Sequence, residues 1–97
     1  KAVEAAKRLN INTVVGNVLS SDTFYDDNKE ANTLWKKMNI LAVEMEAAAL
    51  YMNAARAGKK ALAILTISDH VFTGESLSAQ DRQNSFREMM EIALEIA

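Results

Sequence analysis

The segment ILAVEMEAAAL, residues 40–50, decides the fold of this chain of 97 residues. It opens with apolar residues that predict a buried strand, and the residues after Glu46 are apolar on nearly every face of a predicted helix. The carboxylates of Glu44 and Glu46 lie where the strand meets the helix. Because a buried charge is costly unless it is paired or hydrogen-bonded, we expect these acids to have partners or a function.

Similar apolar elements alternate along the rest of the chain. Apolar residues at helical spacing predict helices over residues 1–9, 31–38, 44–57 and 78–97, and uncharged apolar runs predict buried strands over residues 13–19, 40–43 and 61–67. No hairpin signal such as Asn-Gly joins the strands. We therefore expect helical crossovers and an α/β fold, with a mostly parallel or mixed buried sheet flanked by helices.

Single residues mark several of the predicted boundaries. Asn39 and Gly58 suit the left-handed position that ends a helix. Ser78, three residues before Asp81, predicts an N-cap for the last helix. Gly16, inside the first predicted strand, indicates a bulge or a close approach of the backbone.

The composition is that of an ordinary globular protein, with 49% hydrophobic and 25% charged residues. A net charge of -2 argues against a nucleic-acid partner, and the absence of cysteine excludes disulfides and thiolate metal sites. No apolar run approaches the ~20 residues that cross a bilayer, so we expect a cytoplasmic protein with no membrane partner. The first residue, Lys1, already lies in a helical pattern, which suggests a piece of a longer polypeptide.

Polar or aromatic residues follow each predicted strand, at residues 20–25, 44–46 and 68–70. In open α/β sheets, ligands bind outside the carboxyl ends of the strands. The three strand ends therefore predict a pocket for a small molecule.

Asp69 is the sharpest candidate for chemistry. A carboxyl group held at a strand end among apolar neighbours retains its proton more readily and can act as a general acid, although an aspartate here also commonly caps a turn. The buried stripe of the last helix is predicted to consist of Phe86, Met89, Met90, Ala93, Leu94 and Ala97. Arg82 extends this stripe into the first turn, where a cation opposes the helix dipole and needs an anionic partner. Asp69 and Arg82 could form either part of a catalytic site or a structural ion pair.

The other polar candidates each allow two interpretations. Capping of a helix by ionised carboxylates would explain Glu44 and Glu46. Alternatively, one of them accepts hydrogen bonds from ligand hydroxyls, each worth roughly 1.5–3 kcal/mol. Phe24 is either a platform for a stacked base or a loop aromatic packed on the sheet. His70 is the only histidine, so we expect a structural role rather than a zinc site.

Several short motifs together resemble the bacterial hexameric type of purine nucleoside phosphorylase. They are Gly16-Asn17, SDTFY at residues 21–25, VEMEAA at residues 43–48, ISDH at residues 67–70 and Arg82-Gln83. Their order and spacing match from about Thr13 to the end of the chain. The resemblance implies a nucleoside phosphorylase-like fold, with residues 1–97 as the C-terminal portion of one domain whose upstream portion is missing.

The resemblance also implies roles for individual residues. It implies a nucleoside pocket lined by Phe24, Val43, Glu44, Met45, Glu46 and Ser68. Phe24 would pack against the purine, and Glu46 would bind the 2′ and 3′ hydroxyls of the ribose. Asp69 would be the general acid that protonates N7 of the leaving purine, and Arg82 would move in with its helix to assist.

The implied reaction is the reversible phosphorolysis of a purine nucleoside to the free base and ribose 1-phosphate. It needs no cofactor and uses inorganic phosphate as co-substrate. The family's phosphate site and a histidine from a neighbouring subunit have no counterpart in this chain. The resemblance implies that the full-length protein is a homo-oligomer, a hexamer. Because the phosphate site is missing, we expect this piece alone to be inactive. The alternatives are a hydrolytic purine nucleosidase of the same superfamily and a noncatalytic nucleoside-binding module.

Overall fold

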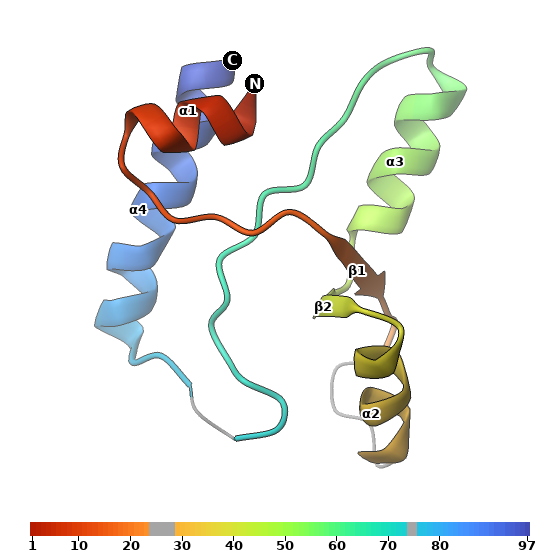
Figure 1. Cartoon of the computed structure of the whole chain (residues 1–97). Helices are drawn as coiled ribbons and strands as arrows, with labels where there is room; N and C mark the ends of the chain where they lie inside the picture. Colours follow the sequence, from red (N-terminus) through yellow and green to blue (C-terminus); the bar gives the residue numbers. More distant parts are fainter. Residues whose placement is uncertain (24–28, 74–75) are drawn as a thin grey trace. The chain divides into compact units, whose positions relative to one another are not determined.

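The computed structural model describes residues 1–23, 29–73 and 76–97, without the side chains of Lys29, Asn84 and Ser85. Its elements, in chain order, are α1 (Ala2–Arg8), β1 (Asn17–Ser20), α2 (Lys29–Lys37), β2 (Ile40–Glu44), α3 (Ala47–Arg56) and α4 (Ala79–Ile96) (Figure 1). They form two compact units: Lys1–Val14 with Ile64–Ala97, and Val15–Ala63. The predicted α/β class is confirmed.

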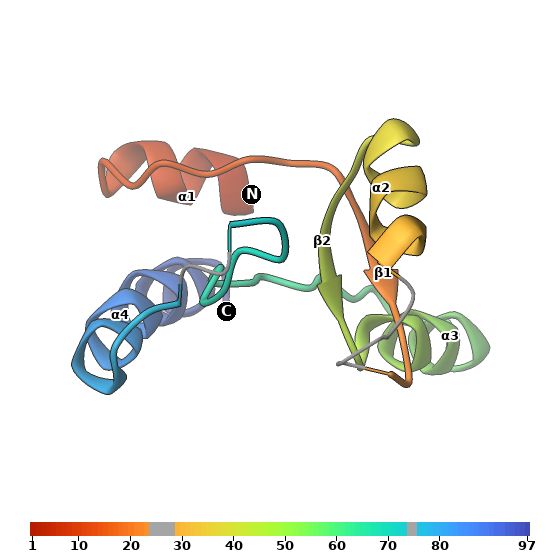
Figure 2. The same cartoon turned by 90° about the horizontal axis from the view of Figure 1, so that it is seen from below.

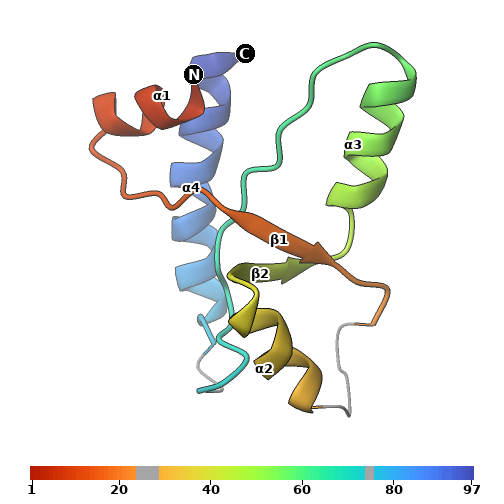
Figure 3. The same ribbon diagram turned by 45° about the vertical axis from the view of Figure 1, so that its right-hand side comes forward.

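The unit Val15–Ala63 is built on a parallel pair of strands, β1 and β2. Ser20 lies opposite Glu44 in the register, and the pairing is irregular between Asn17 and Val18. A Cβ atom added at Gly16 would collide with Cδ1 of Leu41, so the close approach predicted at this glycine is confirmed. Figures 2 and 3 show α2 beside these strands, and α3 follows directly from the end of β2.

The predicted helix ends agree with the structure. Asn39, after α2, and Gly58, after α3, have φ angles of 62° and 65°. This left-handed conformation turns the chain out of the helix, and asparagine and glycine adopt it at least cost. At the start of α4, Ser78 Oγ accepts a hydrogen bond of 3.1 Å from the Asp81 N–H, as the N-cap prediction requires.

The other unit contains the helices α1 and α4, which pack against each other. Ala5 and Ala6 on α1 are fully buried, and Ile92 on α4 is 3% exposed. Figures 1 and 3 show the short α1 against the C-terminal half of α4. Two adjacent alanines allow the helices to approach closely, so the larger Ile92 fills the space between them.

The predicted buried stripe of α4 is wrong in position for every member except Met89, which is half-buried. Phe86, Met90 and Leu94 are exposed, whereas Ile92 and, in part, Ile96 face α1. The sequence of α4 is apolar on more than one side, and the small residues of α1 select the isoleucines. Periodicity alone does not reveal this choice, because the choice depends on the partner helix.

The predicted strand over residues 40–43 agrees with β2, but the other two predicted strands differ from the structure. Residues 61–67 form no strand, and no strand among the described residues pairs with them. β1 covers only the last part of the predicted 13–19, because its partner β2 begins at Ile40, opposite Asn17. Burial of both faces is likewise wrong for this sheet, since Leu41 is exposed. An apolar run becomes a strand only where a neighbour supplies backbone partners.

Candidate functional site

The predicted site residues fall into two groups, one in each compact unit. The first lies at the junction of β2 and α3 and consists of Val43, Glu44, Met45 and Glu46. The second lies around the start of α4 and consists of Ser68, Asp69 and Arg82. Phe24 lies outside the described residues, so its predicted role stays a prediction.

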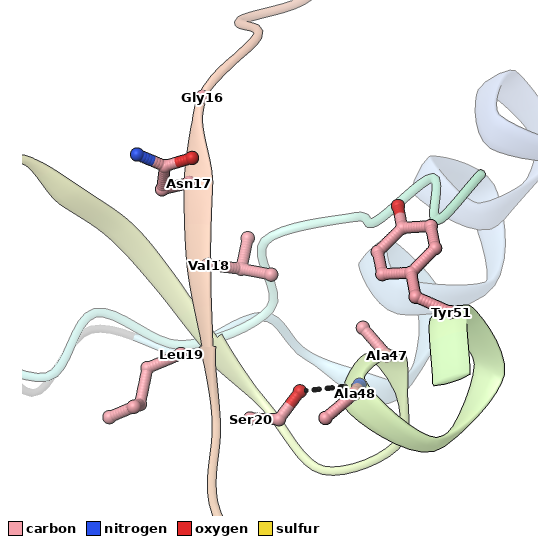
Figure 4. A pocket seen from close by; sticks show the side chains of 8 residues that line it. All are labelled: Gly16, Asn17, Val18, Leu19, Ser20, Ala47, Ala48 and Tyr51. Atoms are coloured by element: carbon pink, nitrogen blue, oxygen red, sulfur yellow. Dashed lines mark hydrogen bonds between the residues drawn. The ribbon is translucent and has the colours of Figure 1, made fainter. Parts of the chain in front are cut away.

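The carboxylate of Glu44 is engaged on both oxygens. Oε1 accepts a hydrogen bond from Ser20 Oγ. Oε2 accepts the backbone N–H groups of Glu46 and Ala47, each at 2.6 Å. Figure 4 shows that Ser20 Oγ also accepts the N–H of Ala48, at 2.9 Å. Glu44 and Ser20 together therefore satisfy the N–H groups that begin α3, which otherwise lack partners within the helix.

These contacts lower the pKa of Glu44 below its ordinary value of 4.5. The hydrogen bond from Ser20 contributes most, and the N–H groups of Ala47 and Glu46 add to it, while desolvation opposes them. Hydrogen bonds to a carboxylate favour its ionised form. Glu44 is therefore a negatively charged cap on a helix N-terminus, which is the structural alternative considered from the sequence.

Glu46 differs from Glu44 although only Met45 separates them. Its backbone occupies the N-cap position of α3, with φ of -127°, and its side chain makes no capping hydrogen bond. The side chain is exposed. The helix therefore uses the backbone of Glu46 and leaves its carboxylate available to a ligand.

Asp69 accepts hydrogen bonds on both carboxylate oxygens, in each case from a side chain. Arg82 Nη2 lies 3.3 Å from Oδ1, and Ser68 Oγ lies 2.9 Å from Oδ2. The anionic partner predicted for Arg82 is confirmed. Charge-assisted hydrogen bonds are typically about 2.7–2.9 Å long, so the contact between Arg82 and Asp69 is a loose one. Both side chains are partly exposed, at 44% and 37%.

Backbone contacts bring the start of α4 back to Asp69. The N–H of Leu77 donates a 2.8 Å hydrogen bond to the carbonyl of Ser68. Asp69 and Ser76 form an antiparallel bridge, after which Ser78 begins the helix. This return of the chain places Arg82, in the first turns of α4, beside Asp69.

His70 has the structural role expected from the sequence. Its Nδ1 accepts the backbone N–H groups of Phe72 and Thr73, both at 3.2 Å. Two donors at Nδ1 place the proton of a neutral ring on Nε2. His70 thus holds the turn that follows Asp69.

Residues 1–97 match the model of a protein family described as the phosphorylase superfamily. The chain belongs to the phosphorylase superfamily. It is similar to the DeoD-type purine nucleoside phosphorylase of Caldanaerobacter subterraneus subsp. tengcongensis, with 53% identity over 97 residues, covering 100% of this chain and 42% of that protein. The same type of enzyme from Psychromonas ingrahamii is 55% identical over 95 residues, covering 98% of this chain and 40% of that protein. The resemblance inferred from the motifs is confirmed, and the chain spans about two fifths of the length of these relatives.

This phosphorylase superfamily member has a hollow beside the start of α3. The hollow, of about 460 Å³, lies beside Ser20 and is lined by β1 residues, Ala47, Ala48 and Tyr51 (Figure 4). In the described part of the chain, no group of three or more His, Cys, Asp or Glu side chains could hold a metal ion. None of the helices there is long and apolar enough to cross a membrane.

Ser20 is the residue of this region whose contribution the sequence did not reveal. The available signal was its place at the carboxyl end of a strand that pairs in parallel with the strand ending in Glu44. A hydroxyl in that register can reach a carboxylate on the neighbouring strand.

Proposed function

We propose that the protein containing this chain is a purine nucleoside phosphorylase, which converts a purine nucleoside and inorganic phosphate reversibly to the free base and ribose 1-phosphate. The observation that carries the proposal is the cluster of Asp69, Ser68 and Arg82 in a member of the phosphorylase superfamily. A carboxyl group can transfer a proton to a departing base, and a neighbouring cation stabilises the carboxylate that remains.

The proposed reaction needs a proton at the purine. A phosphate oxygen forms a bond to C1′ of the ribose while the bond from C1′ to N9 breaks, and its electron pair moves into the purine. Asp69 delivers a proton to N7 and thereby neutralises the leaving group. Arg82 then stabilises the carboxylate that Asp69 becomes. Arg82 Nη2 lies 3.3 Å from Oδ1 of Asp69, close enough for this stabilisation.

The binding roles follow from which groups are left available. Glu46, whose carboxylate the helix does not use, accepts hydrogen bonds from the 2′ and 3′ hydroxyls of the ribose, with Met45 beside the sugar. Val43 and Ser68 line the base pocket, and Phe24 packs against the purine. Glu44 supports this site from its position at the start of α3.

The remaining parts of the enzyme lie outside this chain in our proposal. The chain is the C-terminal portion of a single phosphorylase domain, and the phosphate-binding residues belong to the rest of that domain. The enzyme works in the cytoplasm as a homohexamer and needs no resident cofactor. The 97-residue chain alone is inactive.

Phosphate dependence of purine release by the full-length protein tests the proposal. We expect inosine or adenosine to yield the free base and ribose 1-phosphate only when phosphate is present. Release of free ribose without phosphate would instead identify a hydrolytic nucleosidase. Calorimetric binding of inosine without any turnover would identify a noncatalytic nucleoside-binding module.

A further inference from the structure

We propose that Ser20 is a positioning residue for nucleoside binding, which acts through Glu44 to hold Glu46 at the start of α3. The proposal rests on the proposed function, because it takes Glu46 as the ligand of the ribose hydroxyls. Ser20 itself does not touch the nucleoside.

The first step is the connection between Ser20 and the helix. Ser20 Oγ donates to the Glu44 carboxylate and accepts the N–H of Ala48 at 2.9 Å. One hydroxyl therefore joins the end of β1, the end of β2 and the first turn of α3. A hydroxyl can donate one hydrogen bond and accept others, so both contacts are satisfied together.

The second step leads from Glu44 to Glu46. The Oε2 atom of Glu44 accepts the N–H of Glu46 at 2.6 Å, which fixes the peptide group from which the Glu46 side chain extends. The neighbouring N–H of Ala47 is held by the same oxygen. With Oε1 held by Ser20, the carboxylate of Glu44 keeps one orientation.

The two glutamates therefore have different roles. The carboxylate of Glu44 is hydrogen-bonded within the protein, and Glu46 extends from a fixed backbone toward the ligand. Removing the Ser20 hydroxyl leaves the N–H of Ala48 without its acceptor and lets the Glu44 carboxylate rotate. The position of Glu46 then becomes less defined. The protein binds the ribose hydroxyls, and hence the nucleoside, more weakly, while the rate of the chemical step at the purine does not change.

The test compares Ser20→Ala with Ser20→Thr, which keeps a hydroxyl, and with Thr33→Ala. Thr33 is the control, because it is exposed on α2, away from the predicted strand ends. For the full-length protein, calorimetry gives the Kd of inosine and of 2′,3′-dideoxyinosine, which lacks both hydroxyls, and steady-state kinetics gives kcat.

We expect Ser20→Ala to raise the Kd of inosine on the order of tenfold, as the loss of a hydrogen bond to a charged group does. The Kd of the dideoxynucleoside and kcat should change little, Ser20→Thr should restore binding, and Thr33→Ala should match the wild type. In a Glu46→Gln background, Ser20→Ala should have no further effect on the Kd of inosine.

Two results would overturn the inference. One is an equal change in Kd for both nucleosides. The other is an unchanged Kd for inosine in Ser20→Ala, whatever happens to its melting temperature. Wild-type protein that binds inosine without phosphorolysis would refute the proposed function alone, since Kd still tests Ser20. Wild-type protein that does not bind inosine would refute both.

Discussion

The acids at the start of α3 and the acid before α4 are held in different ways. Glu44 is held by the backbone N–H groups of Glu46 and Ala47 and by Ser20. Asp69 is held only through the side chains of Ser68 and Arg82 among the described residues. Backbone donors at a helix terminus are fixed, whereas side-chain donors can rotate away. The carboxylate of Glu44 is therefore held more firmly than that of Asp69, as suits a structural cap and the proposed proton donor respectively.

Asp69→Asn in the full-length protein should have the largest effect. If Asp69 protonates N7, kcat for inosine should fall by roughly 10²–10⁴, because general acid catalysis contributes about that much. A nucleoside already methylated at N7 leaves without this proton and should lose far less. Steady-state kinetics on both substrates measures the difference, and equal losses would contradict the acid role.

Glu46→Gln should have the next largest effect, and on binding rather than on chemistry. Each hydrogen bond between a ribose hydroxyl and the carboxylate is worth roughly 1.5–3 kcal/mol, so KM for inosine should rise about tenfold or more. The KM of a 2′,3′-dideoxynucleoside should change little. A fall in kcat at constant KM would show that Glu46 acts in the chemical step instead.

Ser78→Ala tests how far the proposed role of Asp69 and Arg82 depends on the start of α4. Loss of the hydrogen bond that the Asp81 N–H donates to Ser78 Oγ should lower the free energy of unfolding by about 1 kcal/mol. Because Arg82 lies just beyond this cap, kcat should fall modestly while inosine binding is kept. Urea unfolding and kinetics provide the measurements, with Ser78→Asp as the control that retains a cap. A weakened inosine affinity with a normal kcat would contradict the proposal that the start of α4 acts in the chemical step and the start of α3 in binding.

The smallest effect concerns the pH dependence of stability that arises from Glu44. The folded protein lowers the pKa of Glu44 below 4.5, so folding favours its ionised form. The resulting stabilisation is complete above that value and is lost as the pH falls through the lowered pKa. Glu44→Gln should therefore flatten the acid limb of a plot of unfolding free energy against pH. An unchanged acid limb would mean that Glu44 adds nothing to stability.

Local signals in the sequence predicted much of the structure. Asn39, Gly58 and Ser78 end or begin helices as expected, because a left-handed φ angle and a capping hydroxyl depend on single residue types. The pairing of Arg82 with Asp69 was also predictable, because a cation in the first turns of a helix needs an anion.

The features that failed depend on partners distant in the sequence. Residues 61–67 are as apolar as a central strand, yet a strand exists only beside another strand. The inward side of α4 was misplaced because Ala5 and Ala6 select Ile92. The pattern of residues alone left the roles of Glu44 and Glu46 open, since they differ in contacts with Ser20 and with the backbone at the start of α3.

The outward side of α4 has a practical consequence. Phe86, Met90 and Leu94 follow one another at intervals of one helical turn, and they are 39%, 52% and 77% exposed. A stripe of this kind draws molecules together in water. The 97-residue chain by itself is therefore expected to aggregate as its concentration rises. Light scattering would give the highest concentration at which it can be assayed.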